Sequence, residues 1–218
     1  MMDFNRLLPE LFRLTDISLS GVQAHQRIMD LSVRNRLYKF AGFKEAPKPS
    51  AVLALLFPDK SNQARMVFIL RKSYNGHHSG QISFPGGKKE PYDKNLYQTA
   101  LRETYEEIGV ASGEVSLIKQ LSPLFIPVSN FQVTPFLAVV KNPPGFKKDP
   151  VEVAEILSVP LFDILNKPLV SIEKEYFGKT YKLKAFQFDK FQIWGATAMI
   201  LAEIVDLFYK SDILSKLK

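Results

Sequence analysis

The apolar positions of the chain fall into short runs typical of β-strands and one long window with helical spacing. Runs rich in Val, Ile, Leu and Phe, bounded by turn-forming residues, predict strands. We expect six of them, at residues 51–57, 65–70, 80–84, 115–121, 133–140 and 153–159. In the window 191–209, apolar residues recur every three or four positions, and Glu203 and Asp206 interrupt them. This window therefore predicts an amphipathic core helix and no membrane span.

The N-terminal part has a different pattern. Residues 5–16 and 21–30 have the composition of two short helices, and the proline-containing stretch 46–50 ends this helical region. We expect residues 1–46 to form a helical extension packed on a domain that spans residues 47–218. A hairpin is predicted around Gly178, and 142–150 is predicted to be an irregular loop. Strands interleaved with a few helices predict an α/β sandwich around a mixed sheet.

Composition narrows the class of protein. The chain has 218 residues, of which 46% are hydrophobic and 23% charged, as expected for a globular protein. Its formal net charge of +7 favours anionic partners such as nucleotides. The absence of cysteine excludes disulfides, thiolate nucleophiles and Cys-type zinc sites, and it favours a cytoplasmic location. The first residues lack a basic segment followed by an apolar run, so we expect no signal peptide.

The stretch 86–110 concentrates like charges on one predicted helix. At about 100° per residue, Glu103, Glu106 and Glu107 fall within an arc of roughly 100°. The opposite face carries Tyr97, Leu101, Thr104, Tyr105 and Ile108. We therefore expect one side of the helix to pack and the acidic side to face solvent or a cation. For an isolated acidic stripe, a solvated surface is the commoner role.

The neighbours of the stripe favour a metal site. Carboxylates are the hard oxygen ligands that Mg²⁺ or Mn²⁺ prefers. Gly86 and Gly87 allow the backbone to approach a metal and to offer a carbonyl oxygen, while Gly109 allows a left-handed helix end. Arg102 is placed to hold a glutamate by paired hydrogen bonds. The stretch thus predicts metal-activated hydrolysis of phosphate esters or anhydrides.

These residues carry a resemblance to a known family. RETYEEIGV, residues 102–110, resembles the core of the Nudix box, written G-x5-E-x7-R-E-U-x-E-E-x-G-U. Two positions depart from it: the first carboxylate is Asp93, with eight residues between it and Arg102, and Thr104 stands where an aliphatic residue is usual. Neither departure touches the three glutamates, but the spacing leaves the start of the helix uncertain.

The preceding stretch, residues 70–93, is similar to the additional signature of the coenzyme A pyrophosphatase branch. HSGQISFPGG shares with it a His, the Gly-Gln pair and Phe-Pro-Gly-Gly. Gly76 and His77 stand where that branch has Leu-Arg, so one cationic contact to substrate is expected to be lost or supplied elsewhere. The resemblance extends more weakly over most of residues 47–205.

The resemblance implies a Nudix-type α/β/α sandwich and hydrolysis of the diphosphate of coenzyme A or its derivatives, giving 4'-phosphopantetheine and adenosine 3',5'-bisphosphate. It implies Mg²⁺ or Mn²⁺ as cofactor. The implied metal ligands are Glu103, Glu106, Glu107 and the Gly87 carbonyl. Glu106, with Glu103 and Arg102, forms the expected catalytic group, and Glu152 or Glu155 is the alternative base. The expected substrate contacts are His78, Gly80, Gln81, Ser83 and Arg71.

Several alternatives stay open at this point. The box does not specify the attached group, so ADP-ribose, a dinucleotide or a capped RNA is a rival substrate, and a nucleotide-sensing module without catalysis is a rival function. Nucleic acid is not expected as a partner, because the chain has no run of interleaved basic and aromatic residues. A homodimer is a further hypothesis, from the apolar faces of the N-terminal helices (Leu7, Leu8, Leu11 and Phe12). Trp194 is expected to pack the C-terminal helix onto the sheet.

Overall fold

The computed structural model describes residues 2–42, 45–72 and 80–216. The helices are α1 (Phe4–Leu11), α2 (Val22–Gln26), α3 (Leu31–Ala41), α4 (Leu96–Ile108), α5 (Leu161–Asn166), α6 (Gly195–Lys210) and α7 (Ile213–Lys216), with 3-10 turns η1 (Phe12–Asp16) and η2 (Ser112–Glu114). The strands are β1 (Lys48–Pro58), β2 (Ala64–Arg71), β3 (Ile82–Ser83), β4 (Gly86–Lys88), β5 (Val115–Gln120), β6 (Leu124–Ile126), β7 (Phe131–Val140), β8 (Val153–Pro160), β9 (Leu169–Tyr176), β10 (Lys179–Phe188) and β11 (Phe191–Ile193).

The central sheet of the described chain is mixed. Its main path runs β3-β2-β1-β7-β5, and β4, β6 and β8 pair with β1, β7 and β2. The pairing of β1 with β7 is parallel, whereas the other pairings in this sheet are antiparallel. A second, antiparallel sheet has the order β11-β10-β9. The predicted mixed sheet is therefore confirmed.

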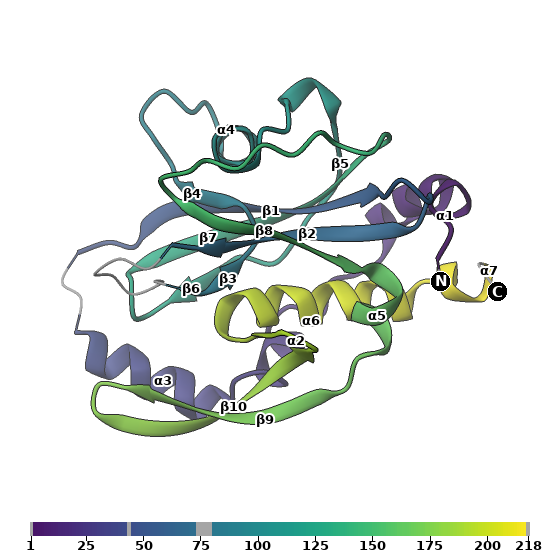
Figure 1. The fold of residues 1–218 in the computed structure, drawn as a ribbon. Coiled ribbons are helices and arrows are strands. Elements are labelled where there is room, and N and C mark those ends of the chain that lie inside the picture. Colours follow the sequence, from purple (N-terminus) through teal and green to yellow (C-terminus); the bar gives the residue numbers. More distant parts are fainter. Residues whose placement is uncertain (1, 43–44, 73–79, 217–218) are drawn as a thin grey trace.

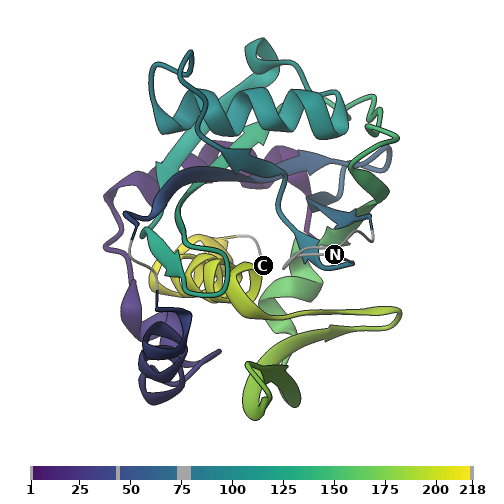
Figure 2. The same cartoon turned by 90° about the vertical axis from the view of Figure 1, so that its left-hand side faces the viewer.

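Helices cover both faces of the central sheet, with α4 on one side and α6 on the other (Figures 1 and 2). Strand residues alternate between the two cores, because successive side chains point to opposite faces. Leu53 and Leu55 of β1 pack in the core beneath α4, while Ala54 and Leu56 belong to the core on the α6 side. This arrangement confirms the predicted α/β/α sandwich.

The N-terminal helices are built into the larger of these cores. Phe4, Leu7 and Leu11 of α1 are fully buried in the same cluster as α6. Leu7 and Leu11 were among the residues expected to offer an apolar face to a second copy, and the structure instead uses them inside the chain. Of the four apolar residues named for that contact, Phe12 is the one whose side chain is exposed, at 41%.

A buried carboxylate also joins the N-terminal segment to the core. Glu203 of α6 is fully buried and accepts hydrogen bonds from the backbone N–H of Gly21 (2.7 Å) and of Ser122 (3.0 Å). The charge that interrupts the apolar pattern of the C-terminal helix thus satisfies two backbone donors from distant segments.

Several local predictions were incomplete. The expected helix at 5–16 is α1 followed by η1, that at 21–30 is the short α2, and the strand at 80–84 is the two-residue β3. Helix α3 was missed; Asp30 caps it by accepting from the Ser32 N–H, and Gly42 ends it in the left-handed conformation. The predicted hairpin is β9–β10, joined through Phe177 and Gly178, both with positive φ as in a tight hairpin turn.

The predicted loop 142–150 contains no helix or strand, but it is tied to the end of α4. The N–H groups of Lys147 and Asp149 donate to the carbonyls of Ile108 and Glu107, each at 3.0 Å. The loop therefore satisfies helix carbonyls that lack a partner within the helix. Within the described part of the chain, no helix has the length and apolar character needed to cross a membrane.

Candidate active site

Helix α4 has the ends that its sequence allows. Asn95 caps the first turn by accepting a hydrogen bond from the Gln98 N–H at 2.9 Å. Gly109 ends the helix with a φ of 77°, and its N–H donates to the Tyr105 carbonyl. Asp93 lies before the cap, so the extra residue between Asp93 and Arg102 is accommodated outside the helix.

The two faces of α4 differ from the expectation at two residues. Ile108 and Thr104 are buried against the sheet as predicted, but Tyr105 is 60% exposed because it lies at the edge of the apolar arc. On the acidic side, Glu106 faces solvent, whereas Glu107 is only 2% exposed. The acidic face therefore does not stand free in solvent: Glu107 packs against the glycine pair.

Arg102 connects two carboxylates of α4 to Asp93 and to β4. Its guanidinium makes a bidentate pair with Asp93, with both nitrogen to oxygen distances 3.0 Å. Its Nη1 donates to Glu103 Oε1 at 2.7 Å and to Glu106 Oε2 at 2.9 Å. A further hydrogen bond reaches the carbonyl of Lys88 in β4. Arg102 thus holds two predicted site carboxylates and fixes α4 to β4, the strand that contains the glycine pair.

Asp93 is the anchor of this arrangement. It is 5% exposed, and its Oδ2 also accepts from the Thr99 hydroxyl and from the Glu90 N–H. The hydrogen bonds from Arg102 lower the pKa of Asp93 to about 2, with the backbone of Glu90 acting in the same direction. The carboxylate therefore stays ionised at any pH at which the protein is expected to work.

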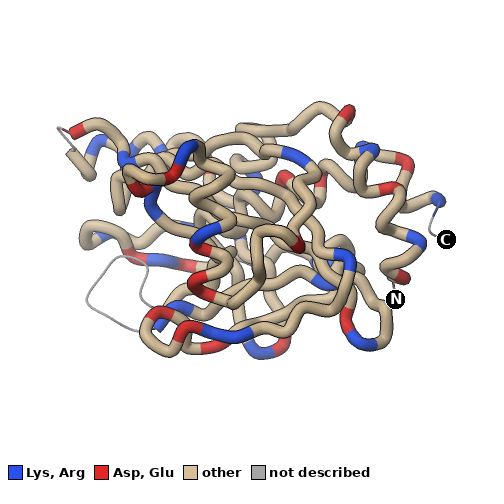
Figure 3. Tube along the Cα trace, turned by 90° about the horizontal axis from the view of Figure 1, so that it is seen from above, with Lys and Arg blue, Asp and Glu red and all other residues tan. Residues whose placement is uncertain are grey.

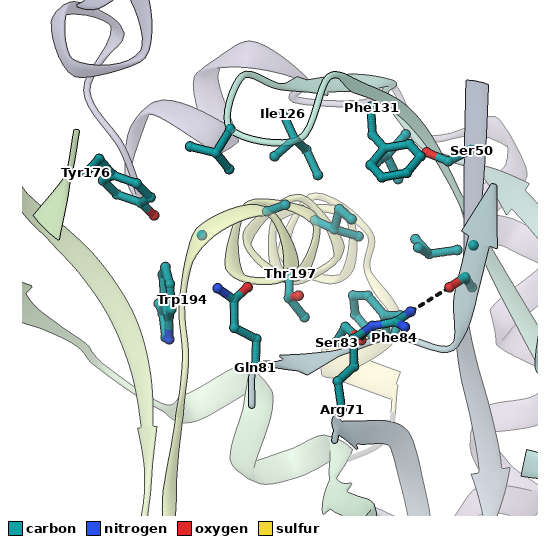
Figure 4. A pocket seen from close by; sticks show the side chains of 18 residues that line it. Ser50, Arg71, Gln81, Ser83, Phe84, Ile126, Phe131, Tyr176, Trp194 and Thr197 are labelled. Carbon is teal, nitrogen blue, oxygen red and sulfur yellow. Dashed lines mark hydrogen bonds between the residues drawn. The ribbon is translucent and has the colours of Figure 1, made fainter. Parts of the chain in front are cut away.

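Glu107 and Arg71 form a second, more buried pair. Glu107 Oε2 accepts from the Gly86 N–H at 2.8 Å, and its Oε1 lies 3.1 Å from Arg71 Nη2. That guanidinium donates its hydrogen bond to the Gly86 carbonyl at 2.7 Å, and Nε donates to the Ser83 hydroxyl at 3.3 Å (Figure 4). Arg71 was expected to contact substrate, which stays a prediction; in the structure it holds the glycine turn.

The glycine pair is required by close contacts on both sides. A Cβ on Gly86 would lie 2.3 Å from the Ala51 carbonyl oxygen, and the φ of Gly86 is 152°. A Cβ on Gly87 would lie 2.4 to 2.5 Å from the carboxylate of Glu103. The first glycine lets β4 pair with β1, and the second makes room for a site carboxylate.

The three helix glutamates do not converge on one point. Among the described residues, no group of three or more His, Asp and Glu side chains has the arrangement of a metal site. Glu103 and Glu106 turn to Arg102, and Glu107 turns to Gly86 and Arg71. The expected convergence is thus not found, because the like charges separate onto the nearest cations and backbone donors.

The donor set nevertheless fits a dication. Burial raises the pKa of Glu107 to about 7 and raises the pKa of Glu103, and Glu152 adds repulsion at both. Within the described chain, the buried Oε1 of Glu107 accepts no hydrogen bond. Partly buried carboxylates that repel one another match the oxygen chemistry of Mg²⁺ or Mn²⁺, here with a glycine beside them and one oxygen that is ion-paired to Arg71 but accepts no hydrogen bond.

A cavity of about 280 Å³ opens beside the glycine pair. Its lining brings together four predicted residues: Arg71, Gln81, Ser83 and Gly87. The other walls are mostly apolar and come from β6, β7, the end of β9 and the start of α6 (Figure 4). A substrate with a diphosphate at the glycine end would therefore place one of its arms in a largely apolar space.

The remaining predicted residues are distributed around this centre. Glu152 is close enough to raise the pKa values of Glu103 and Glu107. The backbone N–H of Glu152 donates a hydrogen bond to the carboxylate of Asp149. Glu155 and Gly80 line a separate hollow, which shares Gln81 and Trp194 with the first cavity. His78 lies outside the described residues.

Sequence reasoning missed three residues of this region. Asp93 was noted only as a departure from the box, although its spacing to Arg102 was the signal of a pair. Trp194 packs against the core that contains α6, as expected, and it also lines the cavity together with Tyr176, which was not expected (Figure 4). Nothing in the local pattern of β9 or α6 distinguishes a cavity wall from a core residue, because both are apolar.

Charges around α4 show no concentration of one sign. Figure 3, seen from the side that α4 covers, shows Lys and Arg positions interspersed with Asp and Glu positions over this face of the described chain. Such a surface differs from the basic stripe of nucleic-acid-binding proteins.

Comparisons with known proteins show what the chain is similar to. A model of the NUDIX domain family matches residues 47–177. Nudix hydrolase 15, mitochondrial, from Arabidopsis thaliana is 34% identical over 171 residues, which are 75% of this chain and 60% of that protein. The chain thus spans less than two thirds of that relative. The uncharacterized Nudix hydrolase NudL from Yersinia enterocolitica is 32% identical over 158 residues, 69% of this chain and 78% of NudL.

Two further matches concern activity and fold. The mitochondrial coenzyme A diphosphatase NUDT8 from Homo sapiens is 32% identical over 164 residues, 73% of this chain and 69% of that protein. The solved structure of a MutT protein from Methanosarcina mazei Go1 superimposes with a TM-score of 0.51 at 16% identity, covering 78% of this chain and 100% of that one. This second likeness concerns the fold alone.

Proposed function

The chain belongs to the Nudix domain family, and from that premise we propose that it hydrolyses the diphosphate bond of coenzyme A or a coenzyme A derivative. The products are 4'-phosphopantetheine and adenosine 3',5'-bisphosphate. In this reaction the oxygen of water joins one phosphorus, the bond from that phosphorus to the bridging oxygen breaks, and the bridging oxygen leaves on the other phosphate. The predicted cytoplasmic location stays a prediction.

One observation supports the proposal most strongly. Residues of the stretch that resembles the coenzyme A pyrophosphatase signature line one cavity: Gln81, Ser83 and Gly87 are in its wall, and Arg71, also in the wall, pairs with Glu107 of α4. A diphosphate lying against the glycine turn would face the acidic helix on one side and extend an arm into the cavity on the other. The relative named as a coenzyme A diphosphatase agrees with this choice of substrate.

Glu103, Glu106, Glu107 and the carbonyl of Gly87 are the groups that would hold Mg²⁺ or Mn²⁺. When bound, the ion supplies charge neutralisation at the diphosphate and acidification of the attacking water. The chain itself keeps these groups in place: Arg102 fixes Glu103 and Glu106, and the Gly86 N–H fixes Glu107. Arg71 contributes positive charge at the glycine end of the cavity.

A carboxylate must accept the proton of the attacking water. We assign this role to Glu106, whose half-exposed side chain (53%) faces solvent while Arg102 fixes one of its oxygens. Glu152 and Glu155 are the alternatives; Glu152 lies near the acidic helix, whereas Glu155 lines the neighbouring hollow. Removing the base is expected to lower kcat by about 100- to 10,000-fold.

Kinetics of the three Glu→Gln variants at these positions test the assignment. If Glu106 is the base, Glu106→Gln loses kcat while Glu152→Gln and Glu155→Gln keep most of it. A larger loss in either of the other variants would transfer the role to that residue. The substrate is tested by comparing kcat/KM for coenzyme A, ADP-ribose, NADH and a dinucleoside polyphosphate, and a preference for one of the last three would refute the coenzyme A assignment.

A further inference from the structure

The cavity beside the glycine turn has two chemically different ends. Arg71 and Ser83 lie at the end that adjoins Gly86, joined by the hydrogen bonds described above. Trp194 and Tyr176 lie at the other end (Figure 4). A volume of about 280 Å³ is just below the range of about 300–1,000 Å³ that is usual for whole ligands, so the cavity takes one arm of a substrate.

The aromatic end is assembled from two separate elements. Tyr176 is the last residue of β9, and Trp194 directly precedes α6 in an extended conformation. Lys174 is two residues before Tyr176 and therefore points to the same side of the strand. Its ammonium lies 4.4 Å from the centroid of the Trp194 ring, within the range of a cation–π contact.

Space is left open next to the indole. Gly195 follows Trp194 with a φ of 63°, and within the described chain a Cβ there would meet no atom within 4 Å. Gly195 also lines the cavity. The absence of a side chain at this position leaves the cavity wall next to Trp194 open.

We propose that this end of the cavity binds the base of a nucleotide, with Trp194 and Tyr176 as its stacking surfaces and Lys174 as a cation for a phosphate on the same nucleotide. The proposal rests on the proposed function, because base and diphosphate belong to one substrate. It assigns the adenine arm of coenzyme A to the cavity and leaves the pantetheine arm outside it.

The chemistry of the walls favours a base over the flexible arm. Every base has a flat π-face that stacks on aromatic side chains, whereas an alkyl or amide chain makes no use of ring geometry. A nucleotide also carries the negative charge that an ammonium beside the ring attracts, which a pantetheine arm lacks. The hydroxyl of Tyr176 is a hydrogen-bond donor at neutral pH, as in any tyrosine, and burial raises its pKa further, to about 12.

The chain offers a direct reporter, because Trp194 is its single tryptophan. Intrinsic fluorescence is titrated with adenosine 3',5'-bisphosphate and, separately, with 4'-phosphopantetheine. We expect the first to change the emission of Trp194 saturably and the second to leave it unchanged. Emission that responds only to 4'-phosphopantetheine, or to neither compound, would overturn the proposal.

A matched pair of variants tests the second stacking surface. Tyr176→Leu is expected to raise the Kd for adenosine 3',5'-bisphosphate by about 5- to 150-fold, the range of one base–aromatic stacking contact. Phe177→Leu is the control, since Phe177 is the adjacent residue, is 47% exposed and stacks on Phe40. Equal Kd values for Tyr176→Leu and wild type would contradict the role of Tyr176.

Turnover separates this proposal from the proposed function. Trp194→Leu should raise KM for coenzyme A with little change in kcat, and Trp194→Phe should restore most of the loss. If coenzyme A is not cleaved while adenosine 3',5'-bisphosphate still changes the fluorescence, the proposed reaction fails and the base site stands. If coenzyme A is cleaved without any fluorescence response, the base site alone fails.

Discussion

The pair between Arg102 and Asp93 allows a prediction of stability that is quantitative. Asp93 has a pKa of about 2 in the folded chain against 3.8 for an unperturbed aspartate. A tenfold change in proton affinity is worth about 1.4 kcal/mol, so the ionised carboxylate contributes about 2 kcal/mol at neutral pH. Asp93→Asn keeps the shape but removes the charge, and we expect its free energy of unfolding to be about 2 kcal/mol lower at pH 7.

The pH dependence of this difference tests its cause. Because the folded pKa is depressed, the contribution is complete above pH 4 and is lost as the pH falls toward 2. At pH 3 about half of it should remain. Urea unfolding of wild type and Asp93→Asn at pH 7, 4 and 3 measures it, with Asp163→Asn, at an exposed position of α5, as the control for loss of one negative charge. A difference that is absent at pH 7, or unchanged at pH 3, would refute the reasoning.

Three other predictions concern the glycine turn, the buried carboxylate and the metal. Gly87→Ala should fold but lose most turnover, because its Cβ displaces the Glu103 carboxylate. Gly86→Ala should unfold at lower urea, because its Cβ meets the backbone of Ala51. Activity and urea midpoints are measured on both variants, and the reverse pattern of effects would contradict this prediction. Glu203→Gln should cost about 1–3 kcal/mol of stability, since the amide cannot accept from both backbone N–H groups, and an unchanged urea midpoint would argue against the buried link. Chelation with EDTA should abolish turnover and added Mg²⁺ or Mn²⁺ should restore it; turnover that persists in EDTA would exclude the proposed metal requirement.

The sheet and the Nudix helix could be predicted from the sequence because their signals are local. The apolar runs predicted the long strands of the central sheet, and Gly178 predicted the turn of the β9–β10 hairpin. Helix α3 was missed because only Leu37 of its residues is buried, so it has little apolar periodicity. Its caps at Asp30 and Gly42 were the signal that could have located it.

The site was predicted in its residue types more than in its contacts. The spacing of Glu103, Glu106 and Glu107 places them on one side of α4, but spacing does not show that the glycine turn buries Glu107 or that Arg71 reaches it. Those contacts bring Arg71 of β2 next to Gly86 of β4, two strands that each pair with β1 and lie apart in the sequence. Long-range geometry of this kind is not encoded in any short motif.

The central claim is that the diphosphate of coenzyme A is cleaved by water at this site. Purified protein is incubated with coenzyme A and Mg²⁺ or Mn²⁺ in ¹⁸O-labelled water, and the products are identified by mass spectrometry beside a Glu103→Gln control. We predict 4'-phosphopantetheine and adenosine 3',5'-bisphosphate in equal amounts, one of them carrying a single ¹⁸O, and no products from the control. Intact coenzyme A under conditions in which ADP-ribose or a dinucleotide is cut would contradict the claim.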